Sequence, residues 1–335
     1  MRQYIATAVS WWKELNRVET SRRRIRLFRQ YAWIVLACNI AVILWGAVVR
    51  ATGSGAGCGE HWPLCNGVAV PQSPQIATII EFVHRLTSGL AVGLALGLVV
   101  FGFQLFPRRH LVRRAAVAAV FFEFMEALLG AALVLLGHVA KDPSVARGYY
   151  LSAHLVNTLM LLAALTLAAW ASGRSPVRIR SGAFGWKFAF GMVGAGLLLL
   201  GVSGVIAALG DTLFKSSSLS QGFRQDLLPA AHPFIRLRVW HPVIAVLVSL
   251  SIEALCFAAR AKQIAWILGA LTLTQIAAGM INLALLAPVP LQIFHLLLAD
   301  AVWIAFILLA ADVLLEPSPD SRFAPSLDFA LTSVK

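Results

Sequence analysis

Residues 77–105 read ATIIEFVHRLTSGLAVGLALGLVVFGFQL, and only Glu81 and Arg85 in this stretch are charged. A helix needs about 20 predominantly apolar residues to cross roughly 30 Å of hydrocarbon. The stretch is therefore long enough to span a membrane, with tilt or protrusion at its ends. Its charged residues and His84 fall within its first third, so we expect any chemistry it carries to lie near one membrane surface.

The rest of the chain repeats this pattern. Of its 335 residues, 59% are hydrophobic and 13% are charged, whereas soluble domains average about 25% charged residues. Such a composition predicts an all-α polytopic membrane protein with eight transmembrane helices. Besides 77–105, we expect the spans near 31–49, 115–137, 149–172, 184–209, 238–259, 264–287 and 291–313.

The net charge of +13 does not indicate a nucleic-acid-binding protein, because the basic residues lie between apolar segments rather than on a soluble face. Arginine clusters follow the spans at 77–105 and 149–172, and another precedes the first span. By the positive-inside rule these regions are cytoplasmic. We therefore expect a multi-pass protein of a bacterial-type inner membrane, with a basic cytoplasmic segment at 1–30 that is not cleaved and a disordered cytoplasmic tail at 314–335.

Matching residues divide the spans into two similar sets of four. His84 in the second span corresponds to His241 in the sixth, and His154 in the fourth corresponds to His295 in the eighth. Between each pair, Glu126-x-x-x-Gly130 corresponds to Gln275-x-x-x-Gly279. The pattern predicts two four-helix bundles, residues 31–172 and 173–313, related by an axis along the membrane normal.

These four histidines are the strongest chemical signal. All four lie near the outer ends of even-numbered spans, one pair per half, and ionisable groups inside a membrane are usually functional. Two histidines on facing helices of a bundle can bind one haem iron from both sides. A hydrogen-bonded core histidine is the structural alternative for any single one. Zinc or copper is less favoured, since such sites recruit cysteines or carboxylates at tight spacing.

Glu81 makes the two halves unequal, because the corresponding residue of the second half is Arg238. Glu81 precedes His84 by three residues and so shares a helical face with it. A carboxylate there must be paired or protonated, which suits it to proton transfer. The alternative is a structural salt bridge with Arg85 or Arg50. The sequence therefore predicts a reactive site in the first half and a plain bis-histidine cofactor site in the second.

The first outer loop contains Cys58 and Cys65 on the side expected to be oxidising, where a disulfide is plausible. A structural staple and a redox role both remain open. Haem propionates are anions that arginine binds through paired hydrogen bonds. We therefore list Arg50, Arg85 and Arg238 as propionate partners.

Taken together, these residues resemble the haem A synthase family. The resemblance is carried by Thr52-Gly-Ser-Gly through Cys58, Trp62-Pro-Leu-Cys65-Asn-Gly67, Glu81-Phe-Val-His84-Arg85, His154, Trp240-His241-Pro242 and His295, and it covers roughly residues 30–313. It implies an oxidoreductase that converts haem O to haem A by oxidising a methyl group to a formyl group for terminal oxidases. It also implies Glu81 as an essential acid, His84 and His154 as ligands of the substrate haem, and His241 and His295 as ligands of a haem b cofactor. One branch of the family pairs loop cysteines as Cys58 and Cys65 would, but has a second pair that this chain lacks.

The expected partners are haem O, a haem O synthase, terminal oxidase assembly and membrane lipid, while a homo-oligomer stays open. Two rival functions also remain. One is a di-haem b-type electron-transfer cytochrome linked to quinone, against which Glu81 argues. The other is a non-catalytic haem-binding assembly factor or transporter, for which Glu81 would be dispensable.

Overall fold

The computed structural model describes residues 2–319, with side chains from residue 19 onward. Eight helices in this part are long and apolar enough to cross a membrane, which confirms the all-α polytopic fold. The long helices are α1 (Arg2–Ala51), α2 (Ile76–Leu105), α3 (Leu111–Leu135), α4 (Val145–Ala171), α5 (Phe184–Leu213), α8 (Trp240–Ala258), α9 (Gln263–Ala284) and α10 (Val289–Leu314).

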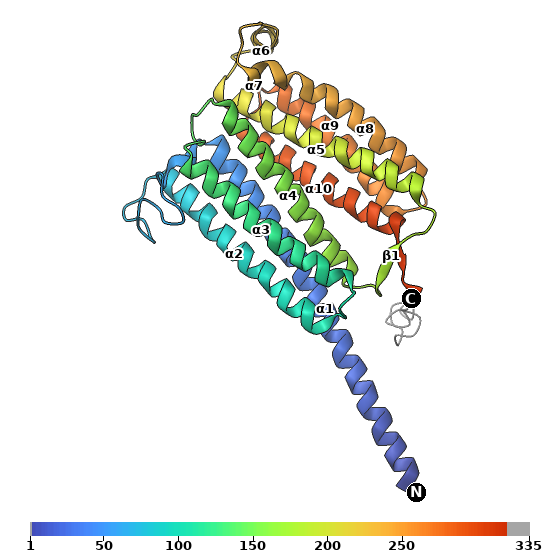
Figure 1. Ribbon diagram of the computed structural model, residues 1–335. Helices are drawn as coiled ribbons and strands as arrows, with labels where there is room; N and C mark the ends of the chain where they lie inside the picture. Colours follow the sequence, from blue (N-terminus) through green and yellow to red (C-terminus); the bar gives the residue numbers. More distant parts are fainter. Residues whose placement is uncertain (1, 320–335) are drawn as a thin grey trace.

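The helices form two adjoining groups (Figure 1). Helices α1 to α4 pack on one another in chain order, as do α5, α8, α9 and α10. The groups meet where α4 packs against α5 and α10 and where α1 packs against α10. Accordingly, half of an apolar 18-residue stretch of α4 is buried inside the protein, whereas in most of the other spans roughly a quarter of the corresponding stretch is buried.

Hydrogen bonds between the groups reinforce this packing at three levels. At one end Arg50 donates to Gln292 Oε1 (2.8 Å). In the middle Trp303 Nε1 donates to the carbonyl of Leu159 (2.6 Å), and toward the other end Trp170 Nε1 donates to Asp312 Oδ1 (2.9 Å). Indole N–H groups in an apolar interior need such acceptors.

The helix boundaries follow local sequence signals. The span α2 ends before Pro107, since a residue preceding proline disfavours the helical conformation. Ser144 caps α4 by accepting a hydrogen bond from the Arg147 N–H. Pro242 has no N–H to donate to the Arg238 carbonyl, and at this place the sixth span divides into α7 (Pro233–Arg238) and α8.

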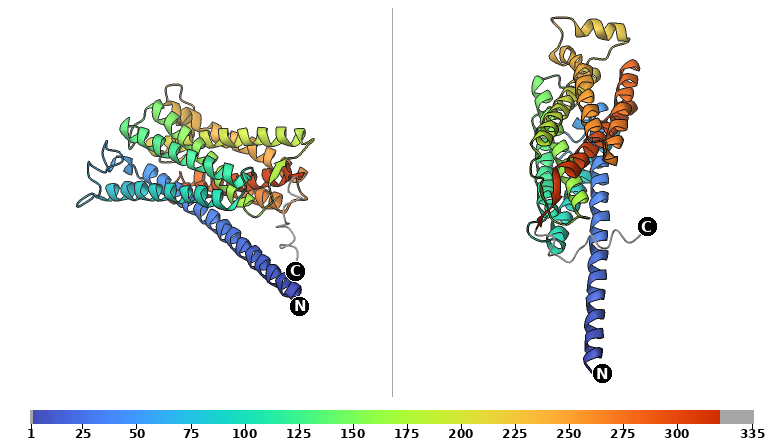
Figure 2. Two further views of the ribbon diagram at one scale, coloured as in Figure 1. Left: turned by 60° about the horizontal axis from the view of Figure 1, so that its bottom comes forward. Right: turned by 90° about the vertical axis from the view of Figure 1, so that its right-hand side faces the viewer.

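Four features differ from the sequence expectation. The basic segment at 2–30 is helical and continuous with the first span, and it projects beyond the bundle in both views of Figure 2. A short helix α6 (Leu219–Asp226) and a 3-10 turn η1 (Ser54–Ala56) lie in the long loops. Strands β1 (Val177–Ile179) and β2 (Leu315–Pro317) pair antiparallel, tying the start of the tail to the α4–α5 connection. The predicted disorder of the tail beyond 319 lies outside the described residues.

Candidate functional site

The four histidines lie at one end of the bundle, which we call the loop end because residues 52–75 and 214–232 lie there (Figure 1). His84, His154, His241 and His295 all fall within the first ten residues of α2, α4, α8 and α10. Each of these helices begins at the loop end, so the histidines lie at comparable depth. The structure thus brings together the residues that the sequence repeat singled out.

Each imidazole ring packs against a glycine of the preceding long helix. A Cβ added at Gly46 would lie 2.9 Å from His84 Cε1, and one at Gly279 would lie 3.0 Å from His295 Cε1. The corresponding distances are 3.2 Å from Gly204 to His241 Cε1 and 3.8 Å from Gly130 to His154 Nε2. These glycines leave room for a ring on the inner face of the neighbouring helix.

The second pair of histidines has the spacing that a shared metal requires. The ring centroids of His241 and His295 are 6.4 Å apart and the ring planes are nearly perpendicular, at 88°. With metal–nitrogen distances of about 2 Å, two imidazoles on opposite sides of one ion place their centroids roughly 6 Å apart. The donor set therefore fits a bis-histidine iron site, as a haem would supply.

A hydrogen bond at Nδ1 of His241 would leave the Nε2 atom of the same ring free to bind such a metal. Its Nδ1 lies 2.9 Å from Ser203 Oγ. His295 Nε2 lies 3.4 Å from Gln275 Nε2, whereas its Nδ1 is buried without a partner among the described residues. A buried imidazole nitrogen without a protein partner is expected of a ring that serves an external ligand.

The first pair has a more polar setting. His154 Nδ1 forms an ion pair with Glu126 Oε2. The other oxygen of Glu126 accepts hydrogen bonds from Asn157 Nδ2 (2.7 Å) and Thr158 Oγ1 (2.9 Å). Across from it, the Nδ1 atom of His84 is buried without a partner in the described structure.

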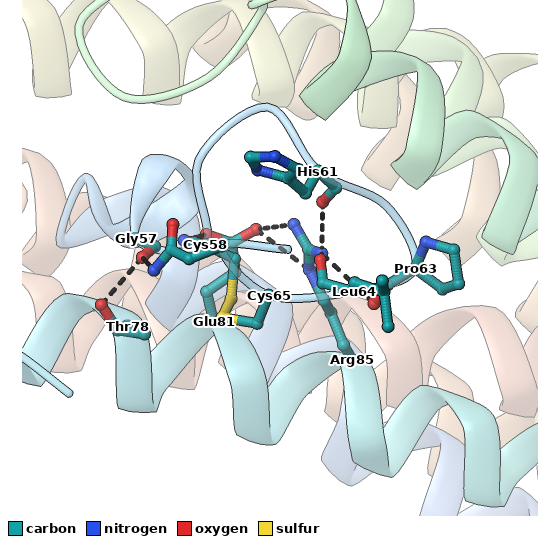
Figure 3. Close-up of a disulfide and its surroundings, with 10 residues drawn as sticks. Gly57, Cys58, His61, Pro63, Leu64, Cys65, Thr78, Glu81 and Arg85 are labelled. Carbon is teal, nitrogen blue, oxygen red and sulfur yellow. Dashed lines mark hydrogen bonds and ion pairs between the residues drawn. A yellow bond between two sulfur atoms is a disulfide. The ribbon is translucent and has the colours of Figure 1, made fainter. Parts of the chain in front are cut away.

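Glu81 is buried, and it holds the first loop against α2 (Figure 3). Its carboxylate accepts hydrogen bonds from the backbone N–H of Cys58 (2.8 Å) and from the guanidinium of Arg85. Arg85 in turn donates to the carbonyls of His61 and Leu64. The salt bridge with Arg85 that the sequence offered as an alternative is therefore formed.

A disulfide joins Cys58 to Cys65, with an S–S distance of 2.00 Å. The expected bond is thus present, and both cysteines are buried. Asn66 and Thr78 hydrogen-bond to the Gly57 carbonyl, so the loop is fixed beside Glu81. This placement favours a structural role for the disulfide.

The other two predicted propionate partners have protein partners of their own. Arg50 donates to Ala208 O and Thr212 Oγ1 as well as to Gln292. Because Gln292 precedes His295 by one helical turn, Arg50 lies closer to the second half than its position in α1 suggested. Arg238 pairs with Asp211 and Asp226.

Two contacts went unrecognised in the sequence. Glu126 was noted only as a mark of the repeat, and Ser203 was not singled out. A usable signal was present, because Gly46 precedes His84 by 38 residues and Gly204 precedes His241 by 37. That matched spacing identifies the helix face opposite each histidine, on which Ser203 adjoins Gly204.

A conventional multi-residue metal centre is not part of the described structure. No group of three or more His, Cys, Asp and Glu side chains among residues 2–319 is arranged to hold a metal ion.

Comparison with known proteins agrees with this arrangement. A sequence model of the family described as cytochrome oxidase assembly protein matches residues 29–307. A haem A synthase of Alkalihalophilus pseudofirmus is 34% identical over 158 residues, 47% of this chain and 52% of that protein. A haem A synthase of Bacillus mycoides is 40% identical over 114 residues, 34% of this chain and 37% of that protein.

A longer relative bears a different name. A protoheme IX farnesyltransferase of Thermus thermophilus is 47% identical over 297 residues, which is 85% of this chain and 48% of that protein. The chain spans about half the length of the curated relatives it matches. Half of that relative thus lies outside the similarity.

Proposed function

This chain belongs to the cytochrome oxidase assembly protein family, and from that premise we propose that it is a haem A synthase. It would oxidise a methyl group of haem O to a formyl group, giving haem A for terminal oxidases. The observation that carries the proposal is that both halves place histidines at one depth, and that of these four rings only His154 ion-pairs with a carboxylate in the described structure.

The second half would hold the haem b cofactor between His241 and His295. The 6.4 Å ring separation and the backing glycines Gly204 and Gly279 support this assignment. When bound, the haem iron would supply a one-electron relay between the substrate and an acceptor. Ser203 would fix the orientation of the His241 ring through Nδ1.

The first half would hold haem O between His84 and His154. With water as the oxygen source, conversion of a methyl to a formyl group (–CH3 + H2O → –CHO + 4 H⁺ + 4 e⁻) releases protons and electrons, so a proton acceptor must lie near and an external one-electron oxidant must take up the electrons. Glu81, one helical turn from His84, is the residue we assign to this task. Its present bonds to Arg85 and Cys58 keep it buried and oriented, and Arg85 and Arg50 would meet propionates at the loop end.

The farnesyltransferase relative fits the same reaction sequence. Its name denotes an enzyme that attaches a farnesyl group to protoheme IX, and its matched region covers about half of it. A haem farnesyltransferase makes the substrate that we assign to this chain. We therefore propose a haem O synthase as the partner that delivers haem O.

From the positive-inside rule we also propose that the histidine end faces outward and that both ends of the chain are cytoplasmic.

The rival functions make different predictions. A di-haem electron-transfer cytochrome would bind two haems without altering either, and a transporter or assembly factor would not need Glu81. The buried Glu81 one turn from His84 and the Glu126–His154 ion pair favour catalysis, because electron transfer alone needs no proton acceptor there.

The test is haem extraction and chromatography from cells that make haem O but lack their own haem A synthase. Expression of this chain should produce haem A, and the His84→Ala variant should leave only haem O. Haem O alone in cells that contain the wild-type protein with haem bound would refute the assignment.

A further inference from the structure

Glu126 contacts His154 on the side of the ring that faces away from Nε2. The Nδ1 atom of His154 pairs with Glu126 Oε2, so Nε2 is the nitrogen left to bind iron. A carboxylate that accepts the second ring N–H of a metal-binding histidine orients the ring and increases its electron donation to the metal.

The carboxylate is itself held in place. Glu126 Oε1 accepts hydrogen bonds from Asn157 Nδ2 and Thr158 Oγ1. Asn157 also donates to the Phe122 carbonyl (2.9 Å). The single hydroxyl proton of Thr158 is shared between Glu126 and the His154 carbonyl, which lies 2.9 Å from Oγ1. Both oxygens of Glu126 therefore have protein partners, and these contacts hold the carboxylate in one position.

The second half lacks this arrangement at every matching position. Gln275 replaces Glu126. Its Nε2 atom lies 3.4 Å from His295 Nε2 rather than from Nδ1, and its Oε1 is buried without a partner in the described structure. Leu298 and Ala299 stand where the first half has Asn157 and Thr158. The histidine partners of the second half are thus an amide and the Ser203 hydroxyl, both uncharged.

We propose that Glu126 is a positioning residue that makes His154 a more strongly electron-donating iron ligand than any histidine of the second half. The inference rests on the proposed assignment of haem to both histidine pairs. Stronger donation stabilises ferric iron, so the haem of the first half has the lower reduction potential. Electrons removed in the first half then move downhill to the second, which is the direction that substrate oxidation requires.

The test is a spectroelectrochemical titration of purified protein loaded with haem in both halves. Glu126→Gln keeps the shape of the side chain and removes its charge. It should raise the potential of the first-half haem and leave that of the second unchanged. Thr158→Val removes one of the hydrogen bonds that hold Glu126, so it should produce a smaller shift in the same direction.

The reciprocal variant Gln275→Glu is the matched control. It should lower the potential of the second-half haem and bring the two potentials together. The electron paramagnetic resonance spectrum of the ferric haem in the altered half should shift with the potential.

Two results would overturn the proposal: potentials unchanged in Glu126→Gln with both haems bound, or equal potentials of the two haems in the wild type. Either result is independent of haem A formation, because the titration measures bound haem rather than turnover. A wild type that makes no haem A but shows the predicted shifts would refute the proposed reaction and keep the role of Glu126.

Discussion

The two four-helix groups share a scaffold and differ in polarity around their histidines. Each places one imidazole pair at the loop end and backs each ring with a glycine. The first group adds Glu81, Glu126 and a disulfide-stapled loop, whereas the second surrounds its rings with neutral Ser203 and Gln275. On the proposed assignment, the second group would hold the cofactor and the first would hold the substrate.

We expect the largest effect on haem A formation from Glu81→Gln, a variant that distinguishes a catalytic role of Glu81 from loop anchoring. Glu81→Gln keeps an oxygen to accept the Cys58 N–H but loses the charge that pairs with Arg85. If Glu81 accepts a proton during turnover, haem A formation should fall by about 10²- to 10⁴-fold, with haem content unchanged. The rate of haem A production in membranes from the expressing cells measures this.

Glu81 as an anchor alone would give a different outcome. The variant would then lose no more activity than one whose loop disulfide is removed. Equal losses in the two variants would contradict a proton-transfer role.

The backing glycines should respond alike in both halves. Gly46→Ala and Gly279→Ala place a methyl group within about 3 Å of His84 and His295. Such overpacking typically destabilises by about 1–3 kcal/mol, and it displaces the ring from its metal. We expect each variant to lose haem from its own half, as measured by the absorbance of the purified protein.

Gly93→Ala serves as the control for these variants, because a Cβ at Gly93 meets no atom within 4 Å. It should retain both haems and the stability of the wild type. Loss of haem from this variant as well would mean that helix glycines act through general folding rather than through the rings.

A smaller effect is expected from the loop of the first half. The double variant Cys58→Ser with Cys65→Ser should lower stability by about 2–3 kcal/mol, as the closed loop is short. Haem A formation should fall modestly, since Glu81 keeps Arg85 but loses a fixed Cys58 N–H. Limited proteolysis of the loop and haem A assay would report both changes, and the haem of the second half should not respond.

The smallest effect is expected at Arg238, which pairs with Asp211 and Asp226. Arg238→Ala should reduce haem occupancy of the second half and leave the first half unaffected. The neighbouring exposed Arg236→Ala is the control and should change neither. Unaltered haem content in purified Arg238→Ala protein would exclude Arg238 as a propionate partner.

Much of this arrangement could be predicted from the sequence. Apolar length gave the eight spans, since lipid requires every backbone group to bond within its own helix. The matched positions of His84, His154, His241 and His295 gave the repeat. The short elements β1, β2 and α6 escaped because they are too brief to produce a periodic apolar signal.

The contacts around the histidines could not be predicted in the same way. Which groups meet across helices depends on helix rotation and crossing, which spacing along one chain does not determine. Glu126 could thus be matched to Gln275 without any sign that it reaches His154. Likewise, Glu81 could be placed on the face of His84, but only the folded loop shows that Arg85 and Cys58 already bind it.

The account depends most on there being two haem pockets, one per half, each closed by its own pair of imidazoles. The direct measurement is the haem content and absorption spectrum of purified protein reconstituted with haem, comparing wild type with His84→Ala and His241→Ala. The account predicts two bis-histidine haems in the wild type, with each variant losing a different one. Binding of a single haem by the wild type, or loss of both haems from either variant while it remains folded, would contradict it.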